Sequence, residues 1–323
     1  MAIMRYAEAL NAALREAMTA DPSVFLFGED VADYGGVFKV SRGLREAFGD
    51  RVRDTPISEQ TLAAMAVSAS MTGLRPVLEI MYADFMPLTL DALVNQASVY
   101  GYVWGDEITL PFVIRTQGGG GLGTGAQHAK SLDSFVAHIP GLKVVAPVTP
   151  ADAKGLLLAA IQDPHPVIVL EHKRLYNTRA EVPDDQGPVP LGRARVARDG
   201  SDVSLIATSR MVVEAEAAAD RLAESGISAE VLDLRTLRPL DVEAIVRSVA
   251  KTRHAVVINE DWGFCGYAAE LSATIMEHAF DDLDAPVERV ATRDMPIPFA
   301  ESLETAVIPD ADVITAAALR ALA

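Results

Sequence analysis

Two residues of this chain of 323 amino acids lie in settings that suit acid–base chemistry. Glu59 ends the segment Asp54-Thr55-Pro56-Ile57-Ser58-Glu59, just before a long apolar helical pattern, and His128 follows a glycine run. Each has an ordinary alternative, because the helix dipole stabilises a carboxylate in a first turn and a histidine at a helix start can cap it. No second His or Cys stands at metal-ligand spacing from His128, so a zinc site is not expected.

Motifs that would complete such a site are missing from the sequence. It contains no Gly-x-x-x-x-Gly-Lys-Ser/Thr loop for a nucleoside triphosphate and no Gly-x-Ser-x-Gly nucleophile elbow. It also lacks a Gly-Asp-Gly followed by Asn, which would bring Mg²⁺ to a diphosphate. The acid–base residues therefore indicate one part of a catalytic site. A partner chain is expected to supply the part that binds phosphate or metal.

The glycine run contains Gly118-x-Gly120-x-x-Gly123, which formally matches a dinucleotide-binding fingerprint and follows a predicted strand. The acidic residue expected about 20 positions later is missing, because the next strand reads Lys143-Val144-Val145-Ala146-Pro147. We therefore favour a loop whose glycines let the backbone approach a ligand and present His128 to a cleft. A non-catalytic subunit that binds a dinucleotide remains the alternative.

More carboxylates follow predicted strands. Glu29 and Asp30 come directly after the first strand. Another strand ends in a group of acids and aromatics, namely Glu79, Tyr82, Asp84 and Phe85. The carboxyl ends of parallel strands meet at one edge of a sheet, where such sheets bind ligands. We expect a site at this edge, although a solvated loop acid is the default for Asp30 and Asp84.

The elements that must position these residues read as two tandem α/β units with parallel or mixed sheets. Short β-branched runs alternate with helical patterns, and several runs are apolar throughout, as in strands buried on both faces. Strands are predicted over residues 24–27, 77–80, 112–116, 144–146 and 167–171, with helices over 62–71, 88–102 and 152–161. A second series has strands over 203–207, 230–234, 255–259 and 287–291, with helices over 213–224, 242–249, 268–278 and 313–322.

A stretch rich in Pro, Asp, Gly and Arg separates the two series, and such residues cannot propagate a helix or an interior strand. We predict a first domain over residues 1–180, a linker over 181–200 and a second domain over 201–323. The length agrees with two domains, because single hydrophobic cores stop growing near about 250–300 residues.

Composition narrows the class of protein. The net charge is −17 and the pI is near 4.7, so we expect neither nucleic acid nor an anionic membrane as a partner. A basic protein would suit this charge as a partner. No apolar run approaches the about 20 residues of a membrane span. The first 21 residues read as an amphipathic helix with a stripe of Tyr6, Leu10, Leu14 and Met18, not as a targeting signal. With Cys265 as the only cysteine, a cytoplasmic protein without an internal disulfide is expected.

Colinear segments along nearly the whole chain form a recognisable set. They are Phe27-Gly28-Glu29-Asp30-Val31-Ala32, Tyr34-Gly35-Gly36-Val37-Phe38-Lys39-Val40, Asp54-Thr55-Pro56-Ile57-Ser58-Glu59, Leu93-Val94-Asn95-Gln96, His138-Ile139-Pro140-Gly141-Leu142-Lys143-Val144-Val145, Asp152-Ala153-Lys154-Gly155-Leu156-Leu157 and Asp233-Leu234-Arg235-Thr236-Leu237. With these segments the chain resembles the beta subunit of the thiamine-diphosphate-dependent decarboxylase component of 2-oxo acid dehydrogenase complexes. The resemblance implies a pyrimidine-binding domain followed by a transketolase-C-terminal-like domain. It also implies an assembly of two alpha and two beta subunits, in which the alpha subunit grips the diphosphate through Mg²⁺.

The resemblance also assigns roles to residues of the first half. Glu59 matches the carboxyl group that hydrogen-bonds N1′ of the thiamine pyrimidine and so activates the cofactor, with Glu29 nearby in the same acidic channel. Ile57, Met81 and Phe85 match residues that pack on the pyrimidine ring. The resemblance therefore implies thiamine diphosphate as a cofactor that this chain shares with its alpha subunit.

His128 matches a histidine implied to donate a proton to the lipoyl group during acyl transfer. Some members of the family also bind a monovalent cation such as K⁺ through main-chain carbonyls. The matching positions are Phe112, Ala160, Ile161, Asp163 and His165. An ordinary helix-to-strand turn explains the same segment at least as well.

The implied substrate is a small 2-oxo acid, and the implied partner beyond the alpha subunit is the acyltransferase core, through its subunit-binding and lipoyl domains. Close relatives handle pyruvate, branched-chain 2-oxo acids or acetoin. We favour the pyruvate or acetoin type, on residues 118–121 and on Glu171-His172-Lys173. A fragment of transketolase or of deoxyxylulose-phosphate synthase is the rival within thiamine enzymes, and the length argues against it.

Overall fold

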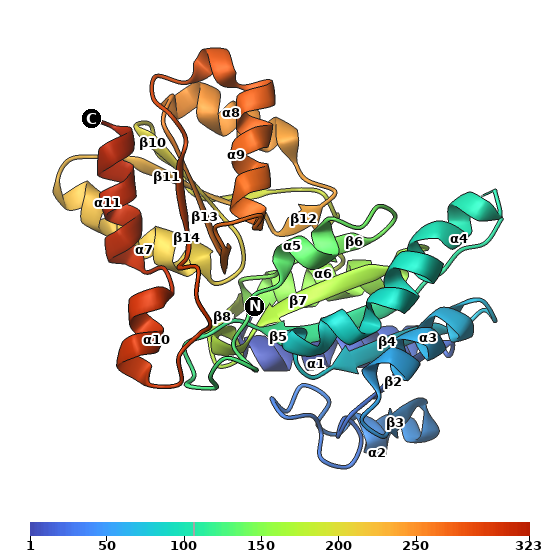
Figure 1. Ribbon diagram of the computed structural model, residues 1–323. Helices are drawn as coiled ribbons and strands as arrows, with labels where there is room; N and C mark the ends of the chain where they lie inside the picture. The colour runs from blue at the N-terminus through green and yellow to red at the C-terminus, as the bar shows by residue number, and fades with distance from the viewer. Residues whose placement is uncertain (106) are drawn as a thin grey trace. The chain divides into compact units, whose positions relative to one another are not determined.

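A computed structural model describes residues 1–105 and 107–323 (Figure 1). The chain forms two compact units, of which the first contains Met1–Gly118 and Phe135–Leu191. The second unit contains Gly119–Ser134 and Gly192–Ala323. The segment that carries His128 thus packs with the second unit, although the two α/β series in the sequence would count it with the first.

The first unit is built on a sheet in which every pair of neighbouring strands is parallel, in the order β6-β7-β5-β4-β2-β3. The strands are β2 (Val24–Gly28), β3 (Val52–Asp54), β4 (Arg75–Ile80), β5 (Val113–Gly118), β6 (Lys143–Val145) and β7 (Val167–His172). The five predicted strands are confirmed, whereas the short β3 was not predicted. Strands β4, β5 and β7 are buried along almost their whole length, which explains their apolar composition.

The main helices of this unit pack through the stripes that the sequence predicts. Helix α1 (Tyr6–Ala20) buries Tyr6, Leu10, Leu14 and Met18 and packs against α6 (Pro150–Gln162). Helix α6 starts where the Thr149 hydroxyl accepts a hydrogen bond from the backbone of Asp152, with Pro150 in the first turn. Helix α3 (Glu59–Ser70) packs on β4. Shorter pieces are α2 (Leu44–Phe48), η1 (Gly49–Arg51), α5 (Asp133–Ala137) and η4 (Lys173–Leu175).

Two helix predictions were wrong in part. Residues before Tyr6 form strand β1 (Ala2–Arg5), which pairs antiparallel with β8 (Arg179–Val182), so the first helix starts only at Tyr6. The single helix predicted over residues 88–102 is divided into η2 (Ala83–Thr89), η3 (Ala92–Ala97) and α4 (Ser98–Val103). The tight turns of η2 contain Pro87, which has no backbone N–H, and η3 has wider π-helical turns.

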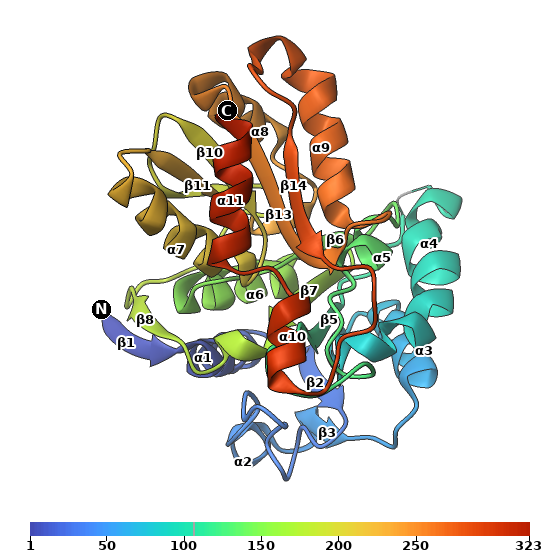
Figure 2. The same ribbon diagram turned by 60° about the vertical axis from the view of Figure 1, so that its left-hand side comes forward.

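The second unit has its own sheet, in the order β14-β13-β10-β11-β9 (Figure 2). Its strands are β9 (Arg195–Arg198), β10 (Val203–Ala207), β11 (Ala229–Asp233), β13 (Ala255–Trp262) and β14 (Glu288–Thr292), and β12 (Thr236–Arg238) follows β11 in the chain. All pairs are parallel except β9 with β11. The predicted strands are confirmed, and the edge strand β9 lies within the predicted linker.

The helices of the second unit pack in pairs. Helices α7 (Met211–Glu224) and α11 (Ala311–Ala321) contact each other, as do α8 (Val242–Thr252) and α9 (Tyr267–His278). Two short helices, η5 (Phe280–Asp282) and α10 (Glu301–Val307), lie between these elements in the chain. Among the helices of residues 1–105 and 107–323, none is both long and apolar enough to cross a bilayer.

Candidate active site

The carboxyl ends of three neighbouring strands bring the predicted residues of the first unit to one sheet edge (Figure 1). Strand β2 lies between β4 and β3, and Gly28 pairs with residues of both. Glu29 follows β2, Met81 follows β4, and the segment that leads to Glu59 follows β3. Because the three strands are parallel, these residues leave the sheet on the same side.

Close backbone packing fixes the turn that carries Glu29. Gly28 has φ +155°, and a Cβ atom there would lie 2.6 Å from the carbonyl oxygen of Glu79 on the next strand. The Asp54 carboxylate accepts a hydrogen bond of 2.7 Å from the backbone N–H of Ala32. The backbone N–H of Thr55 donates to the carbonyl oxygen of Gly28 at 3.0 Å. These contacts join the ends of β2, β3 and β4 into one rigid edge.

Glu29 and Glu59 form an acidic pair at this edge. Each side chain is buried, with 7% of its surface exposed. Burial raises the pKa of Glu29, and the charges of Glu59 and Asp30 raise it further. The Oε1 atom of Glu29 is buried without a hydrogen-bond partner among the described residues. Glu29 therefore resists ionisation more than an ordinary glutamate, and one of its oxygens is left for a ligand donor.

Apolar side chains flank the acidic pair. Ile57 precedes α3 by two residues and is 78% exposed, so its side chain is accessible to a ligand at this edge. Met81 and Phe85 are half-buried, and Phe85 lies in η2, which packs against α3. The structure thus brings all five predicted cofactor-binding residues to adjoining elements of the first unit.

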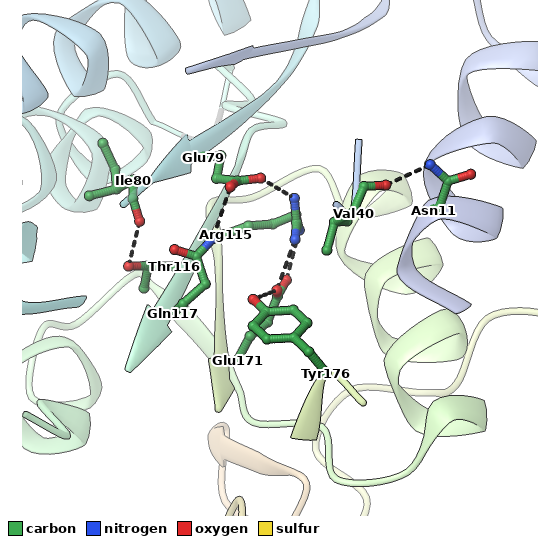
Figure 3. A network of polar contacts seen from close by, with 9 residues as sticks. All are labelled: Asn11, Val40, Glu79, Ile80, Arg115, Thr116, Gln117, Glu171 and Tyr176. Atoms are coloured by element: carbon green, nitrogen blue, oxygen red, sulfur yellow. Dashed lines mark hydrogen bonds and ion pairs between the residues drawn. The ribbon is translucent and has the colours of Figure 1, made fainter. Parts of the chain in front are cut away.

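A buried ion-pair network links strands β4, β5 and β7, and its central residue was not predicted from the sequence (Figure 3). Arg115 of β5 is fully buried and donates to both carboxylate oxygens of Glu171, at 2.7 and 2.8 Å. It also donates to Glu79 of β4 at 2.7 Å. Tyr176 donates to Glu171, and Gln117 donates to Glu79. The signal in the sequence is one arginine in the middle of an apolar strand, where a charge needs partners.

The network is continuous with the loop that follows Glu29. The Phe38 ring stacks on Tyr176, with centroids 4.4 Å apart and planes 12° from parallel. Asn11 of α1 donates to the carbonyl oxygen of Val40 at 2.6 Å (Figure 3). A Cβ atom on Gly36 would lie 3.7 Å from a carboxylate oxygen of Glu79. The same buried charges that hold the sheet strands together therefore support the loop on which Glu29 lies.

His128 lies in the second unit, in the loop made by Gly119–Ser134. Its side chain is half-buried, its backbone N–H donates to Gly125, and its carbonyl oxygen accepts a bond of 2.8 Å from the Thr124 hydroxyl. The backbone N–H groups of Gly120, Gly121 and Gly123 donate to the carboxylates of Glu260 and Glu304. Amides bonded to carboxylates of the protein itself are not free to cradle a dinucleotide pyrophosphate, which argues against that alternative.

The carbonyl groups predicted to bind a monovalent cation lie elsewhere in the first unit. Phe112 precedes β5 and the other positions precede β7, so they lie at the amino ends of the strands, opposite the Glu29 edge. The Arg75 guanidinium donates to the carbonyl oxygens of Ile161 and Asp163, at 2.8 and 3.3 Å. The carbonyl oxygen of Phe112 accepts from the backbone of Val167. A cation here would compete with the Arg75 guanidinium for two of these carbonyl oxygens, which argues against a cation at these positions.

Glu260 and Glu304 were also missed. Glu260 is an acid inside the buried strand β13, which is the same kind of signal as Arg115. Glu304 lies in the short helix α10, and nothing in the local sequence marks it as buried.

The two units match known domain families. Residues 3–179 match the transketolase pyrimidine-binding domain, and residues 192–314 match the transketolase C-terminal domain. The fold is also that of a solved split-gene transketolase, described as an inactive beta4 tetramer, with a TM-score of 0.82 over 99% of this chain and 98% of that chain. Sequence identity to that chain is 24%, so this likeness concerns the fold alone. The protein is thus of the two-domain transketolase type.

Similar proteins narrow the family. The chain is 46% identical to the mitochondrial pyruvate dehydrogenase E1 component subunit beta-2 of Oryza sativa, over 98% of this chain and 86% of that protein. It is 44% identical to the corresponding beta subunit of Rickettsia conorii, over 96% and 95%. It is 43% identical to the acetoin:2,6-dichlorophenolindophenol oxidoreductase subunit beta of Cupriavidus necator, over 97% and 96%. The chain belongs to the beta subunits of thiamine-diphosphate-dependent 2-oxo acid dehydrogenases, as the sequence predicted.

Proposed function

We propose that this chain is the beta subunit of a pyruvate dehydrogenase, which decarboxylates pyruvate oxidatively and transfers the acetyl group to lipoamide. The observation that carries the proposal is the buried pair of Glu29 and Glu59 at the carboxyl edge of the first sheet, where the pKa of Glu29 is raised by burial and by its acidic neighbours. The relatives from rice and Rickettsia, which are named pyruvate dehydrogenase subunits, support pyruvate as the substrate.

The residues at this edge fit the pyrimidine of thiamine diphosphate. The ring offers a nitrogen that can share a proton with a carboxyl group and a flat face that suits apolar side chains. Glu59 supplies a buried carboxyl, the orphan oxygen of Glu29 can take a further donor, and the exposed Ile57 can cover the ring. When bound, thiamine diphosphate supplies the electron sink that a 2-oxo acid needs in order to lose CO₂.

Each residue then has a distinct task. Glu59 would hydrogen-bond N1′ of the pyrimidine, and Glu29 would lie beside it as a second carboxyl whose pKa is raised by burial and by the charges of Glu59 and Asp30. Ile57, Met81 and Phe85 would pack on the ring and exclude water from this hydrogen bond, which would strengthen it. His128 donates a proton to the lipoyl group during acyl transfer.

The chain is active only with an alpha subunit, in an assembly of two alpha and two beta chains. The sequence has no Gly-Asp-Gly followed by Asn, so the alpha subunit holds the diphosphate and Mg²⁺. In the described part of the chain, no group of three or more His, Cys, Asp or Glu side chains is arranged to hold a metal ion. The proposed compartment is the cytoplasm.

The acyltransferase core is the second partner. A net charge of −17 favours docking of a small basic subunit-binding domain, and the lipoyl domain delivers the acceptor. Binding of a Lys/Arg-rich core peptide to the assembled enzyme should weaken steeply as salt rises from low to physiological strength. Failure to bind at low salt, or binding indifferent to salt, would remove this part of the proposal.

Acetoin is the second candidate substrate, because the Cupriavidus necator relative is 43% identical and is named for acetoin oxidation. The kcat/KM of dye reduction by the assembled enzyme should be measured with each of three substrates, namely pyruvate, a branched-chain 2-oxo acid and acetoin. We expect pyruvate to give the highest kcat/KM.

The test of the mechanism is Glu59→Gln in the assembled enzyme. The amide cannot share the acidic proton, so we expect normal assembly and a loss of decarboxylation of about 10²-fold or more. Glu46→Gln is the matched control, since Glu46 lies in the first turn of α2 and is exposed. His128→Ala should keep partial decarboxylation and lose acetyl transfer to lipoamide. Full overall activity of either site variant would overturn the role given to that residue.

A further inference from the structure

Two glutamates of the second unit accept hydrogen bonds from the glycine run. Oε1 of Glu304 accepts from the backbone N–H of Gly121 at 2.7 Å, and Oε2 accepts from Gly123 at 2.9 Å. Oε1 of Glu260 accepts from the backbone N–H of Gly120 at 2.7 Å. The two acids come from different elements, α10 and β13, and both are buried, Glu304 with 2% of its surface exposed. Successive backbone amides form a concave anion-binding site, which this protein fills with its own carboxylates.

Apolar contacts hold the same loop on the other side of His128. Ala129 is buried in a small cluster with Ile297 and Val307, against which Ile308 packs. A Cβ atom on Gly120 would lie 2.3 Å from a methyl carbon of Ile308, so the loop approaches this segment as closely as glycine permits. Figure 2 shows α10 beside the green loop that carries these residues. His128 is therefore bracketed by carboxylate contacts before it and apolar contacts after it.

We propose that Glu304 is a positioning residue for acyl transfer, which holds the His128 loop in its working conformation with the help of Glu260. The proposal rests on the proposed role of His128. An ionised carboxylate has acceptors for both amides, and bonds to a charged acceptor are roughly twice as strong as neutral ones. Gly121 and Gly123 have positive φ angles, so these turns have little preference of their own and need an external anchor.

The first test compares Glu304→Gln with Glu301→Gln in the assembled enzyme. The glutamine is isosteric, but its NH₂ end faces one backbone N–H and cannot accept from it, so one of the two anchors is lost. We expect kcat/KM for acetylation of the lipoyl domain to fall about tenfold. Decarboxylation with an artificial dye acceptor should change less than about twofold, because the carboxylate of Glu304 bonds to the loop of His128, whose role is in acyl transfer. Glu301 lies in the same helix and is exposed, so its variant should match the wild type in both assays.

A double variant separates positioning from general stability. If Glu304 acts through His128, Glu304→Gln should add no further loss to the residual acetyl transfer that is measurable for His128→Ala at high enzyme concentration. A contribution that is merely structural would lower transfer in both backgrounds by the same factor. Equal losses in the two backgrounds would therefore overturn the proposal.

Gly120→Ala disturbs the contact between the loop and α10 by a change in the loop itself, because the new methyl group clashes with Ile308 and crowds Glu304. It should reproduce the selective loss of acetyl transfer even if Glu304→Gln does not assemble. Hydrogen exchange of peptides from residues 119–130 should quicken in Glu304→Gln and in Gly120→Ala, but not in Glu301→Gln. Unchanged exchange together with unchanged transfer refutes the proposal. If instead His128→Ala itself transfers acetyl groups normally, the role of His128 fails, and exchange alone decides whether Glu304 anchors the loop.

Discussion

Replacement of Arg115 by methionine should destabilise the first unit more than any exposed arginine change. Methionine fills a similar elongated volume in β5 but leaves Glu79 and Glu171 without their cation. The side chains of Arg115 and Glu171 are fully buried and that of Glu79 is 3% exposed, so water cannot replace the lost charge. Removal of one partner from a buried ion pair costs about 3–5 kcal/mol in unfolding free energy. We expect the loss of unfolding free energy caused by Arg115→Met to lie in this range at pH 8.

The loss should depend on pH with a defined sign. Burial raises the pKa of Glu171, and in the wild type the neighbouring guanidinium opposes that shift. Without Arg115, the folded-state pKa rises further above the unfolded value near 4.5. A carboxyl of this kind contributes stability that is present below its unfolded pKa and is lost as pH rises through its folded pKa. The destabilisation should therefore be smaller at pH 5 than at pH 8.

Native-state hydrogen exchange of peptides from β4, β5 and β7 measures this opening free energy within the first unit. Asp50→Asn is the control in the same unit, because the pair of Asp50 with Arg45 is exposed and should contribute at most about 1 kcal/mol. In an Arg115→Met background, Glu79→Gln with Glu171→Gln removes the stranded charges and should restore part of the loss. A loss below about 1 kcal/mol at pH 8, or one independent of pH, would refute the reasoning.

Three further predictions concern other residues. Burial and the charge of Asp261 raise the pKa of Asp133 to about 7, so wild-type stability should fall by up to about 4 kcal/mol as pH rises from about 4 through 7. Asp133→Asn should remove this slope in urea unfolding followed against pH. Gly28→Ala should destabilise by about 1–3 kcal/mol, because its methyl group meets the Glu79 carbonyl at 2.6 Å, and a urea midpoint equal to wild type would contradict this. Exchange of K⁺ for tetramethylammonium should leave the activity of the assembled enzyme unchanged, because Arg75 already donates to carbonyls of the predicted cation site. A requirement for K⁺ would instead support a bound cation at this site.

Local patterns in the sequence were sufficient for the parallel sheets and for part of the acidic edge. Apolar strand runs, helical stripes and residues that follow strands are short-range features, and parallel strands necessarily bring their carboxyl ends together. Glu29 and Phe85 could therefore be assigned to one edge from the strands that they follow. Met81 was assigned only by the resemblance, as were Ile57 and Glu59, because the short strand β3 that precedes them was not predicted. The breaks in the helix predicted over residues 88–102 were missed, because hydrophobic spacing does not distinguish α from π or 3₁₀ turns.

Contacts between residues far apart in the chain were decided only by the tertiary structure. Arg115 meets Glu171 across 56 residues, and Gly121 meets Glu304 across 183 residues. No local pattern encodes either pairing, because a buried charge shows only that it needs a partner and not where that partner lies. The same physical reason explains why the His128 loop, which follows a strand of the first unit, packs with the second. The backbone amides of this loop donate to Glu260 and Glu304, which come from distant parts of the second unit.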